Sequence, residues 1–135
     1  MTEDDIYVER KYYDSGDLWC ETPYVNDKKN GIEKVYYERS EPWLDDFGEL
    51  WRETPYIDGK KNGVEREYYE SGQLKSETPY KKGKKNGIEK YYYRSGKLMW
   101  ETPYVNGLEN GIEKWYDESG NLLDSPLYND DEIPF

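Results

Sequence analysis

The side chains of this chain that could take part in chemistry are carboxylates, tyrosines and tryptophans. Among 135 residues there are 30 Asp and Glu, 16 Tyr and 5 Trp, but no His and one Cys, Cys20. Without histidine the chain lacks the usual general base and the imidazole metal ligand, and Cys20 cannot form a Cys/His pair. Carboxylate pairs are uninformative in so acidic a chain. We therefore expect no catalysis, no cofactor and no metal site.

Aromatic side chains and Met that are exposed at a surface commonly anchor protein–protein interfaces. Two sets of residues, each containing side chains of this kind, are predicted to bind a protein. The first set is Trp19, Trp51, Tyr91, Met99 and Trp115, and the second is Trp43, Leu44, Asp45, Asp46 and Phe47. The positions of both sets follow from the repeats of the sequence.

The chain repeats itself with a period of 24 residues. The tetrapeptide ETPY begins at Glu21, Glu53, Glu77 and Glu101, with spacings of 32, 24 and 24 residues. A fixed period of this length indicates stacked structural repeats with atypical ends. The chain is therefore predicted to be a single repeat domain, residues 1–135. Its units lie at about 8–31, 32–63 with an insertion at 40–47, 64–87, 88–111 and 112–135, the last being a degenerate C-terminal cap.

Each unit contains two turn signals and two segments of strand composition. Asn-Gly (Asn86-Gly87, for example) precedes one segment, and Ser-Gly (Ser95-Gly96) separates it from the next. The segments between them are rich in Tyr, Ile, Val, Thr and Trp, and Gly or Pro interrupts the chain too often for helices. We predict an all-β protein: an elongated antiparallel meander of about five stacked hairpins and about ten strands, in a single twisted sheet.

Strict alternation along each strand predicts two different faces. On one face the residue types repeat: Ile88 and Tyr92 would share it with Leu98, Trp100, Thr102 and Tyr104 of the return strand. Residues that do not vary between units are expected to stack unit on unit. The other face varies, and it would carry Trp19, Trp51, Tyr91, Met99 and Trp115. The variation is consistent either with drift on a solvated face or with a recognition surface.

The insertion after Tyr37 reads SEPWLDDFGEL and mixes apolar with acidic residues. Insertions in repeat arrays often project from one face and carry binding. The alternative is a cap that folds over the repeating face.

The formal net charge of −11 favours a basic protein partner and disfavours nucleic acid and anionic membranes. Lysines gather at the Asn-Gly edge of the predicted sheet, where they more often aid solubility than bind phosphate. No segment has the apolar length of a signal peptide or a membrane span, so we expect a cytoplasmic protein that is a monomer when free.

Two stretches, YKKGKKNG from Tyr80 and YYRSGKL from Tyr92, carry a family resemblance. They resemble the MORN repeat in its bacterial 24-residue variant, over about Val8 to Asn129. The resemblance implies an elongated β-meander. It also implies an immunity protein or antitoxin that neutralises a toxin domain, because bacterial proteins of this variant are commonly so labelled. The alternative is a structural scaffold or a phospholipid-associated adaptor, as in longer eukaryotic arrays. The regular Glu-Thr-Pro and the insertion depart from the usual pattern.

Overall fold

The computed structural model describes residues 3–41 and 48–123, and within these ranges its regular structure consists of β-strands alone. The strands are β1 (Ile6–Tyr12), β2 (Leu18–Val25), β3 (Lys28–Lys29), β4 (Gly31–Tyr36), β5 (Leu50–Ile57), β6 (Lys60–Lys61), β7 (Gly63–Tyr68), β8 (Leu74–Lys81), β9 (Lys84–Lys85), β10 (Gly87–Tyr92), β11 (Leu98–Val105), β12 (Leu108–Glu109) and β13 (Lys114–Trp115).

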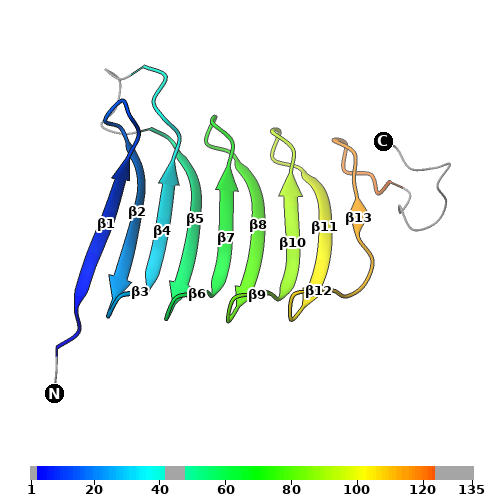
Figure 1. Ribbon diagram of the computed structural model, residues 1–135. Coiled ribbons are helices and arrows are strands. Elements are labelled where there is room, and N and C mark those ends of the chain that lie inside the picture. The colour runs from blue at the N-terminus through cyan, green and yellow to red at the C-terminus, as the bar shows by residue number, and fades with distance from the viewer. Residues whose placement is uncertain (1–2, 42–47, 124–135) are drawn as a thin grey trace.

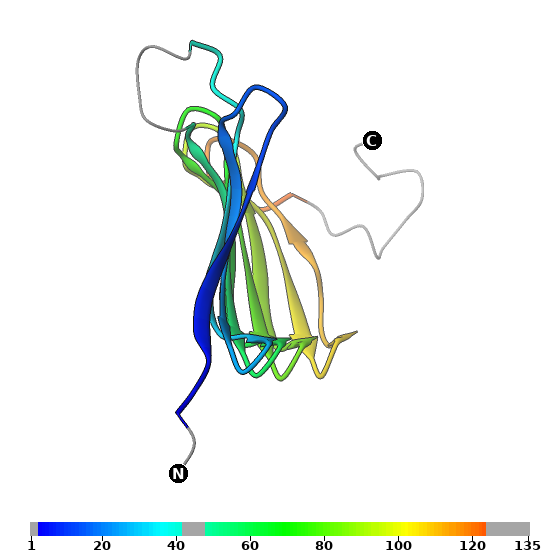
Figure 2. The same cartoon turned by 60° about the vertical axis from the view of Figure 1, so that its left-hand side comes forward.

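All of these strands belong to one antiparallel sheet (Figure 1). The long strands follow one another in the order β1-β2-β4-β5-β7-β8-β10-β11, and the two-residue strands β3, β6 and β9 pair with the ends of β2, β5 and β8. Seen from the side, the sheet is a single twisted layer (Figure 2). The predicted single-sheet meander is confirmed. In the part of the chain that the structure describes, the short strands raise the number from the expected ten or so to 13.

The tight hairpin turns do not lie at Asn-Gly, where the sequence predicted them. They lie a few residues earlier, at Asp58–Gly59 and Lys82–Gly83 for example, where both residues have positive φ. This is the geometry of the two-residue turns that match the twist of a hairpin. Asn62 instead follows β6, and its side-chain oxygen accepts a 3.1 Å hydrogen bond from the backbone N–H of Lys82 in the next turn. Asn-Gly therefore links the turns of successive units.

The glycine of Asn-Gly is required for two reasons, as Gly87 illustrates. Its φ is +123°, a conformation that L side chains rarely adopt. A Cβ at this position would also lie 2.9 Å from Cγ of Pro79, the proline of the preceding ETPY. At the opposite edge, Gly96 has φ +94°, and its N–H donates to the carbonyl of Tyr93, as the Ser-Gly turn predicted.

A β-bulge in each hairpin changes which residues share a face. Tyr91 pairs with Trp100 but Tyr92 pairs with Leu98, so Met99 is an extra residue in β11. Because cross-strand partners share a face, Glu89 and Tyr91 lie with Thr102 and Trp100, and Ile88 and Lys90 lie with Pro103 and Glu101. We call these the threonine face and the proline face. The predicted placement of Trp100, Thr102 and Tyr104 beside Ile88 is wrong, because strict alternation overlooks the extra residue.

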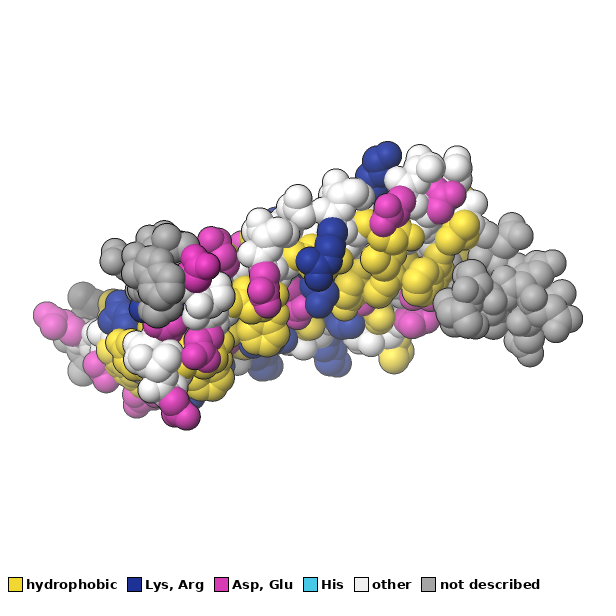
Figure 3. Space-filling model, turned by 90° about the horizontal axis from the view of Figure 1, so that it is seen from above, with side chains coloured by type: hydrophobic (Ala, Val, Ile, Leu, Met, Phe, Trp, Pro, Cys, Tyr) yellow, Lys and Arg dark blue, Asp and Glu magenta, His cyan; other side chains and the backbone are white. Residues whose placement is uncertain are grey.

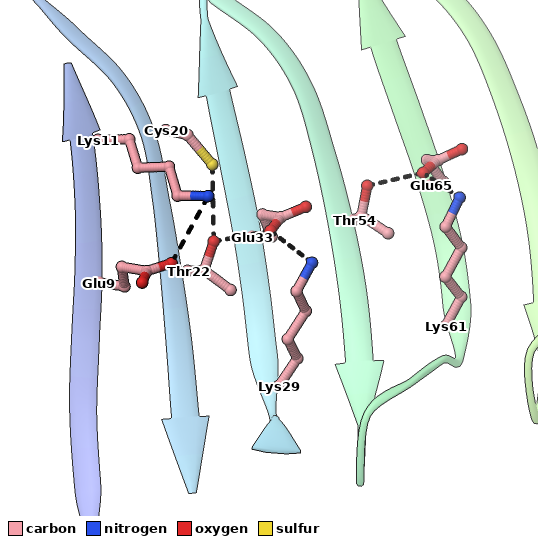
Figure 4. Close-up of polar contacts among 9 residues, drawn as sticks. All are labelled: Glu9, Lys11, Cys20, Thr22, Lys29, Glu33, Thr54, Lys61 and Glu65. Carbon is pink, nitrogen blue, oxygen red and sulfur yellow. Dashed lines mark hydrogen bonds and ion pairs between the residues drawn. The ribbon is translucent and has the colours of Figure 1, made fainter. Parts of the chain in front are cut away.

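The threonine face is held together by a polar ladder rather than by an apolar core. The Thr54 hydroxyl donates a 2.7 Å hydrogen bond to Glu65, and the Lys61 ammonium lies 3.0 Å from the same carboxylate (Figure 4). Lys61 also lies over the ring of Tyr80, 4.8 Å from its centroid. Thr54 is 1% exposed and Glu65 8% exposed. Thr22–Glu33–Lys29 and Thr78–Glu89–Lys85 repeat the arrangement.

On the proline face, the Glu of each ETPY connects neighbouring units. The Tyr68 hydroxyl donates a 2.6 Å hydrogen bond to Glu53, and Tyr92 donates likewise to Glu77. Cross-strand pairing also places each of these carboxylates between two basic residues. The resulting row alternates in sign across the whole sheet: Arg10, Glu21, Lys34, Glu53, Arg66, Glu77, Lys90, Glu101 and Lys114. The recurrent Glu-Thr-Pro thus has a structural role at each of its three residues.

Candidate functional site

One row of the threonine face differs in residue type from strand to strand. Cross-strand pairing at the level of the bulges defines this row, which we call the variable row: Lys11, Cys20, Val35, Arg52, Glu67, Ser76, Tyr91, Trp100 and Trp115. The neighbouring row of Thr and Glu is nearly constant. The sheet therefore presents a changing set of side chains on a constant support.

Two of the predicted binding residues, Trp19 and Trp51, line one pocket at the N-terminal end of this row. The pocket has a volume of about 210 Å³, and Cys20, Val35 and Arg52 also line it. Trp19 and Trp51 are the extra residues of their bulges, since Lys11 pairs with Cys20 and Val35 pairs with Arg52. The bulges turn both indoles toward the threonine face, beside Val35, which is 4% exposed.

Aromatic and cationic neighbours support the two indoles. The Tyr13 and Trp19 rings have centroids 6.3 Å apart, and the Tyr37 and Trp51 rings 6.1 Å apart. The Arg52 guanidinium lies 5.0 Å from the Trp51 ring centroid. Trp19 nevertheless remains 39% exposed. Each ring is thus held on one side and accessible on the other.

At the C-terminal end of the variable row, three aromatic rings form a continuous stack. The centroids of Tyr91 and Trp100 are 4.2 Å apart, and those of Trp100 and Trp115 are 4.7 Å apart. The Trp115 indole N–H donates a 3.1 Å hydrogen bond to Glu113. Tyr91 and Trp115 were predicted as binding residues. Trp100 was not, because strict alternation had placed it on the other face.

The two aromatic groups are separate surfaces. Three strand spacings, roughly 14 Å, lie between Trp51 on β5 and Tyr91 on β10. Glu67 and Ser76 occupy the variable row between them. From above, hydrophobic side chains gather in patches along the sheet with charged ones between them (Figure 3). Met99, the remaining predicted residue, is the half-buried extra residue of the last bulge.

The insertion residues Trp43, Leu44, Asp45, Asp46 and Phe47 lie outside the described residues. The chain that leads into the insertion is anchored by Arg39, whose side chain and backbone N–H both donate to Asp17, with Nη2 at 2.6 Å from Oδ1. These hydrogen bonds hold the pKa of Asp17 below its usual value. Among the described residues, a pocket beside this anchor is lined by Arg39 itself and by four glutamates, Glu38, Glu41, Glu49 and Glu70.

The lysine edge is only partly available to a ligand. Lys29, Lys61 and Lys85 fold onto the threonine face and form ion pairs of 3.0 Å with Glu33, Glu65 and Glu89. Burial is the largest single effect and acts to lower the pKa of Lys61, but the hydrogen bond and charge attraction of Glu65, with smaller contributions from Tyr80 and Tyr56, together raise the pKa above its usual value. Lys28, Lys60 and Lys84 remain exposed.

Comparison with known families identifies the repeat. The MORN repeat variant matches residues 8–26, 61–82, 85–106 and 109–125. Residues 27–60, which contain the insertion, fall outside the match, although β4 and β5 pair in the same register as β7 and β8. Comparisons with curated proteins and with solved structures gave no match. Among the described residues, no helix is long and apolar enough to cross a membrane.

More than half of the chain fits this repeat, and MORN repeats are generally non-catalytic modules for binding or scaffolding. The chain belongs to the MORN repeat variant family.

Proposed function

We propose that this protein is an immunity protein or antitoxin, which binds a basic toxin domain through the threonine face and neutralises it. The observation that carries the proposal is the variable row, with Trp19 and Trp51 at one end and the stack around Trp100 at the other. Large rigid aromatic side chains bury much area at a small entropic cost, and they dominate the binding energy of protein interfaces.

Charge supports the basic character of the partner. The chain carries a net charge of −11, and among the described residues four glutamates line the pocket at the base of the insertion, together with Arg39, which is paired with Asp17. A second hollow beside Trp19 contains Asp14 and Glu38. Acidic groups around an aromatic anchor speed the capture of a basic partner and set its orientation. Such a surface suits a toxin domain that itself binds a polyanion.

The lysine edge favours the alternative, a phospholipid-associated scaffold, less than the sequence suggested. In each repeated Lys-Lys pair, the second lysine forms an ion pair with a carboxylate of the same chain, as Lys61 does with Glu65. The exposed remainder, such as Lys60, is spread along an edge without arginine forks that would recognise phosphate. We expect no sedimentation with anionic phospholipid vesicles at physiological salt.

The test uses the protein encoded beside this gene as the candidate partner. Co-expression should relieve its toxicity, and titration calorimetry with the purified pair should give saturable binding. Trp51→Ala should weaken that binding, whereas Ile88→Ala, which removes a smaller, exposed apolar side chain from the proline face, should not. If Trp51→Ala binds as tightly as the unchanged protein and Ile88→Ala loses binding, the proposed surface is wrong. Co-sedimentation of the protein with vesicles would favour the alternative function.

A further inference from the structure

The outer edge of β1 has the features of an inter-unit contact whose second strand is missing. β1 is the end of the sheet, and no described strand pairs with its outer edge. Its residues correspond to those of β4, 24 positions later: Glu9 to Glu33, Arg10 to Lys34 and Tyr12 to Tyr36. The contact that β2 makes with β4 therefore shows what would complete β1.

In the β2–β4 contact, β2 provides partners for three side chains of β4, those of Glu33, Tyr36 and Lys34. Thr22 donates a 2.7 Å hydrogen bond to Glu33, Glu21 accepts a 3.1 Å hydrogen bond from the Tyr36 hydroxyl, and Glu21 also pairs in register with Lys34. β2 thus supplies a carboxylate followed by a hydroxyl.

The corresponding side chains of β1, Tyr12 and Glu9, are exposed instead. Tyr12 is 58% exposed whereas Tyr36 is 8% exposed, and among the described residues the Tyr12 hydroxyl has no hydrogen-bond partner. Glu9 is exposed, with Lys11 at 3.9 Å as its ion-pair partner, whereas Glu33 is buried under Thr22 and Lys29.

The charges of β1 also discriminate between partners. Full-length antiparallel pairing of β1 with β1 of a second copy would place Glu9 opposite Glu9 and Val8 opposite Arg10. Like charges directly opposite each other destabilise a strand pair. A strand with a carboxylate opposite Arg10 would instead continue the alternating row of the proline face.

We propose that the outer edge of β1 binds, by antiparallel strand addition, an extended segment of a partner protein in which Glu or Asp is followed by Thr or Ser. The carboxylate would face Arg10 and accept from the Tyr12 hydroxyl, and the hydroxyl would donate to Glu9. Main-chain pairing supplies the attraction of such complexes, and the side chains select the register. This site is independent of the proposed function. A peptide can bind the edge of β1 even if the threonine face binds no toxin.

The probe is the synthetic peptide LKSETPYK, the sequence of β8, added at millimolar concentration to the full chain. Two-dimensional NMR should show shifts and slowed amide exchange confined to β1 and the strand beside it. The peptide LKSKTPYK, with Lys opposite Arg10, should bind about tenfold more weakly. Arg10→Glu should reverse this preference, and Tyr12→Phe, which removes a hydroxyl without a described partner, should weaken LKSETPYK severalfold.

Melting temperatures and circular dichroism of both variants exclude unfolding as the cause of a loss. Equal binding of the two peptides, perturbation at β11 instead of β1, or no binding at millimolar peptide would overturn the proposal. So would sedimentation showing that the free protein is already a dimer that Arg10→Glu dissociates, because the edge would then belong to a second copy.

Discussion

The Thr54 hydroxyl donates a 2.7 Å hydrogen bond to the Glu65 carboxylate, and both side chains are buried in a sheet only one layer thick. A carboxylate in this position is stabilised by its donors, because burial removes it from water. Lys61 supplies the second donor and then covers the pair by lying against Tyr80. The repeat thus replaces the apolar core that a single sheet cannot form with a hydrogen-bonded ladder beneath Lys and Tyr side chains.

The first prediction tests this ladder. Thr54→Val keeps the size of the side chain but removes the donor to Glu65, so the free energy of unfolding should fall by about 1–3 kcal/mol. Thr54→Ser retains a hydroxyl and should lose much less. Urea unfolding of the two variants measures the difference. If valine is as stable as serine, the hydroxyl contributes nothing and the ladder is not what stabilises the face.

The second prediction concerns the two kinds of glycine. Gly96→Ala places an L side chain at φ +94° with nothing within 4 Å, so it should cost about 1–2 kcal/mol of stability. Gly87→Ala adds to this strain the contact with Pro79 and should cost distinctly more. Lys84→Ala, at an exposed position nearby, should be nearly silent. Thermal unfolding of the three variants ranks their stabilities. If Gly87→Ala is as stable as Gly96→Ala, the contact with Pro79 does not contribute to the requirement for glycine at position 87.

The third prediction is a loss of stability at alkaline pH. Burial and then the neighbouring Glu53 raise the pKa of Tyr68 from 10.0 to about 12, and Tyr36 and Tyr92 shift alike. A pKa that is higher in the folded state gives stability that is fully present below pH 10.0 and is lost as the pH rises to about 12. The melting temperature should therefore fall across this interval.

Tyr68→Phe provides the control for the alkaline transition. Phenylalanine cannot ionise, so this variant should start less stable at neutral pH, where the hydrogen bond to Glu53 is missing, and should lose less on going to high pH. Tyrosinate absorbance followed beside the melting temperature shows whether ionisation and unfolding coincide. Ionisation of all tyrosines near their ordinary pKa without loss of structure would contradict the buried geometry.

The sequence predicted the meander well because its turn residues, its period and its strand composition all point to hairpins. It could not predict the bulge, since an extra residue such as Met99 leaves no mark on composition and changes every facing residue after it. Trp100 was missed as a candidate site residue for this reason. The hairpin turn was misplaced because Asn-Gly is the stronger turn signal, although Lys82–Gly83 forms the turn.

The last prediction joins the variable row to the proposed function. Trp19, Trp51 and Trp115 lie on the threonine face, and each keeps part of its ring accessible. Truncation to Ala should cost little stability but about 2 kcal/mol or more of binding free energy for a true anchor. Tyr68→Ala should do the reverse, losing about 2 kcal/mol or more of stability, because its ring and hydroxyl connect two units.

Charge reversal at Asp45 and Asp46 of the insertion should act on a third quantity, slowing association and changing its salt dependence more than it changes dissociation. Melting temperatures, binding isotherms and association rates with the candidate partner separate the three classes of variant. Trp100→Ala should fall between them, because this ring is stacked on both sides and supports Tyr91 and Trp115. If the Trp19 and Trp51 variants unfold while Tyr68→Ala loses only binding, the threonine face is the structural side of the sheet and the partner binds the proline face.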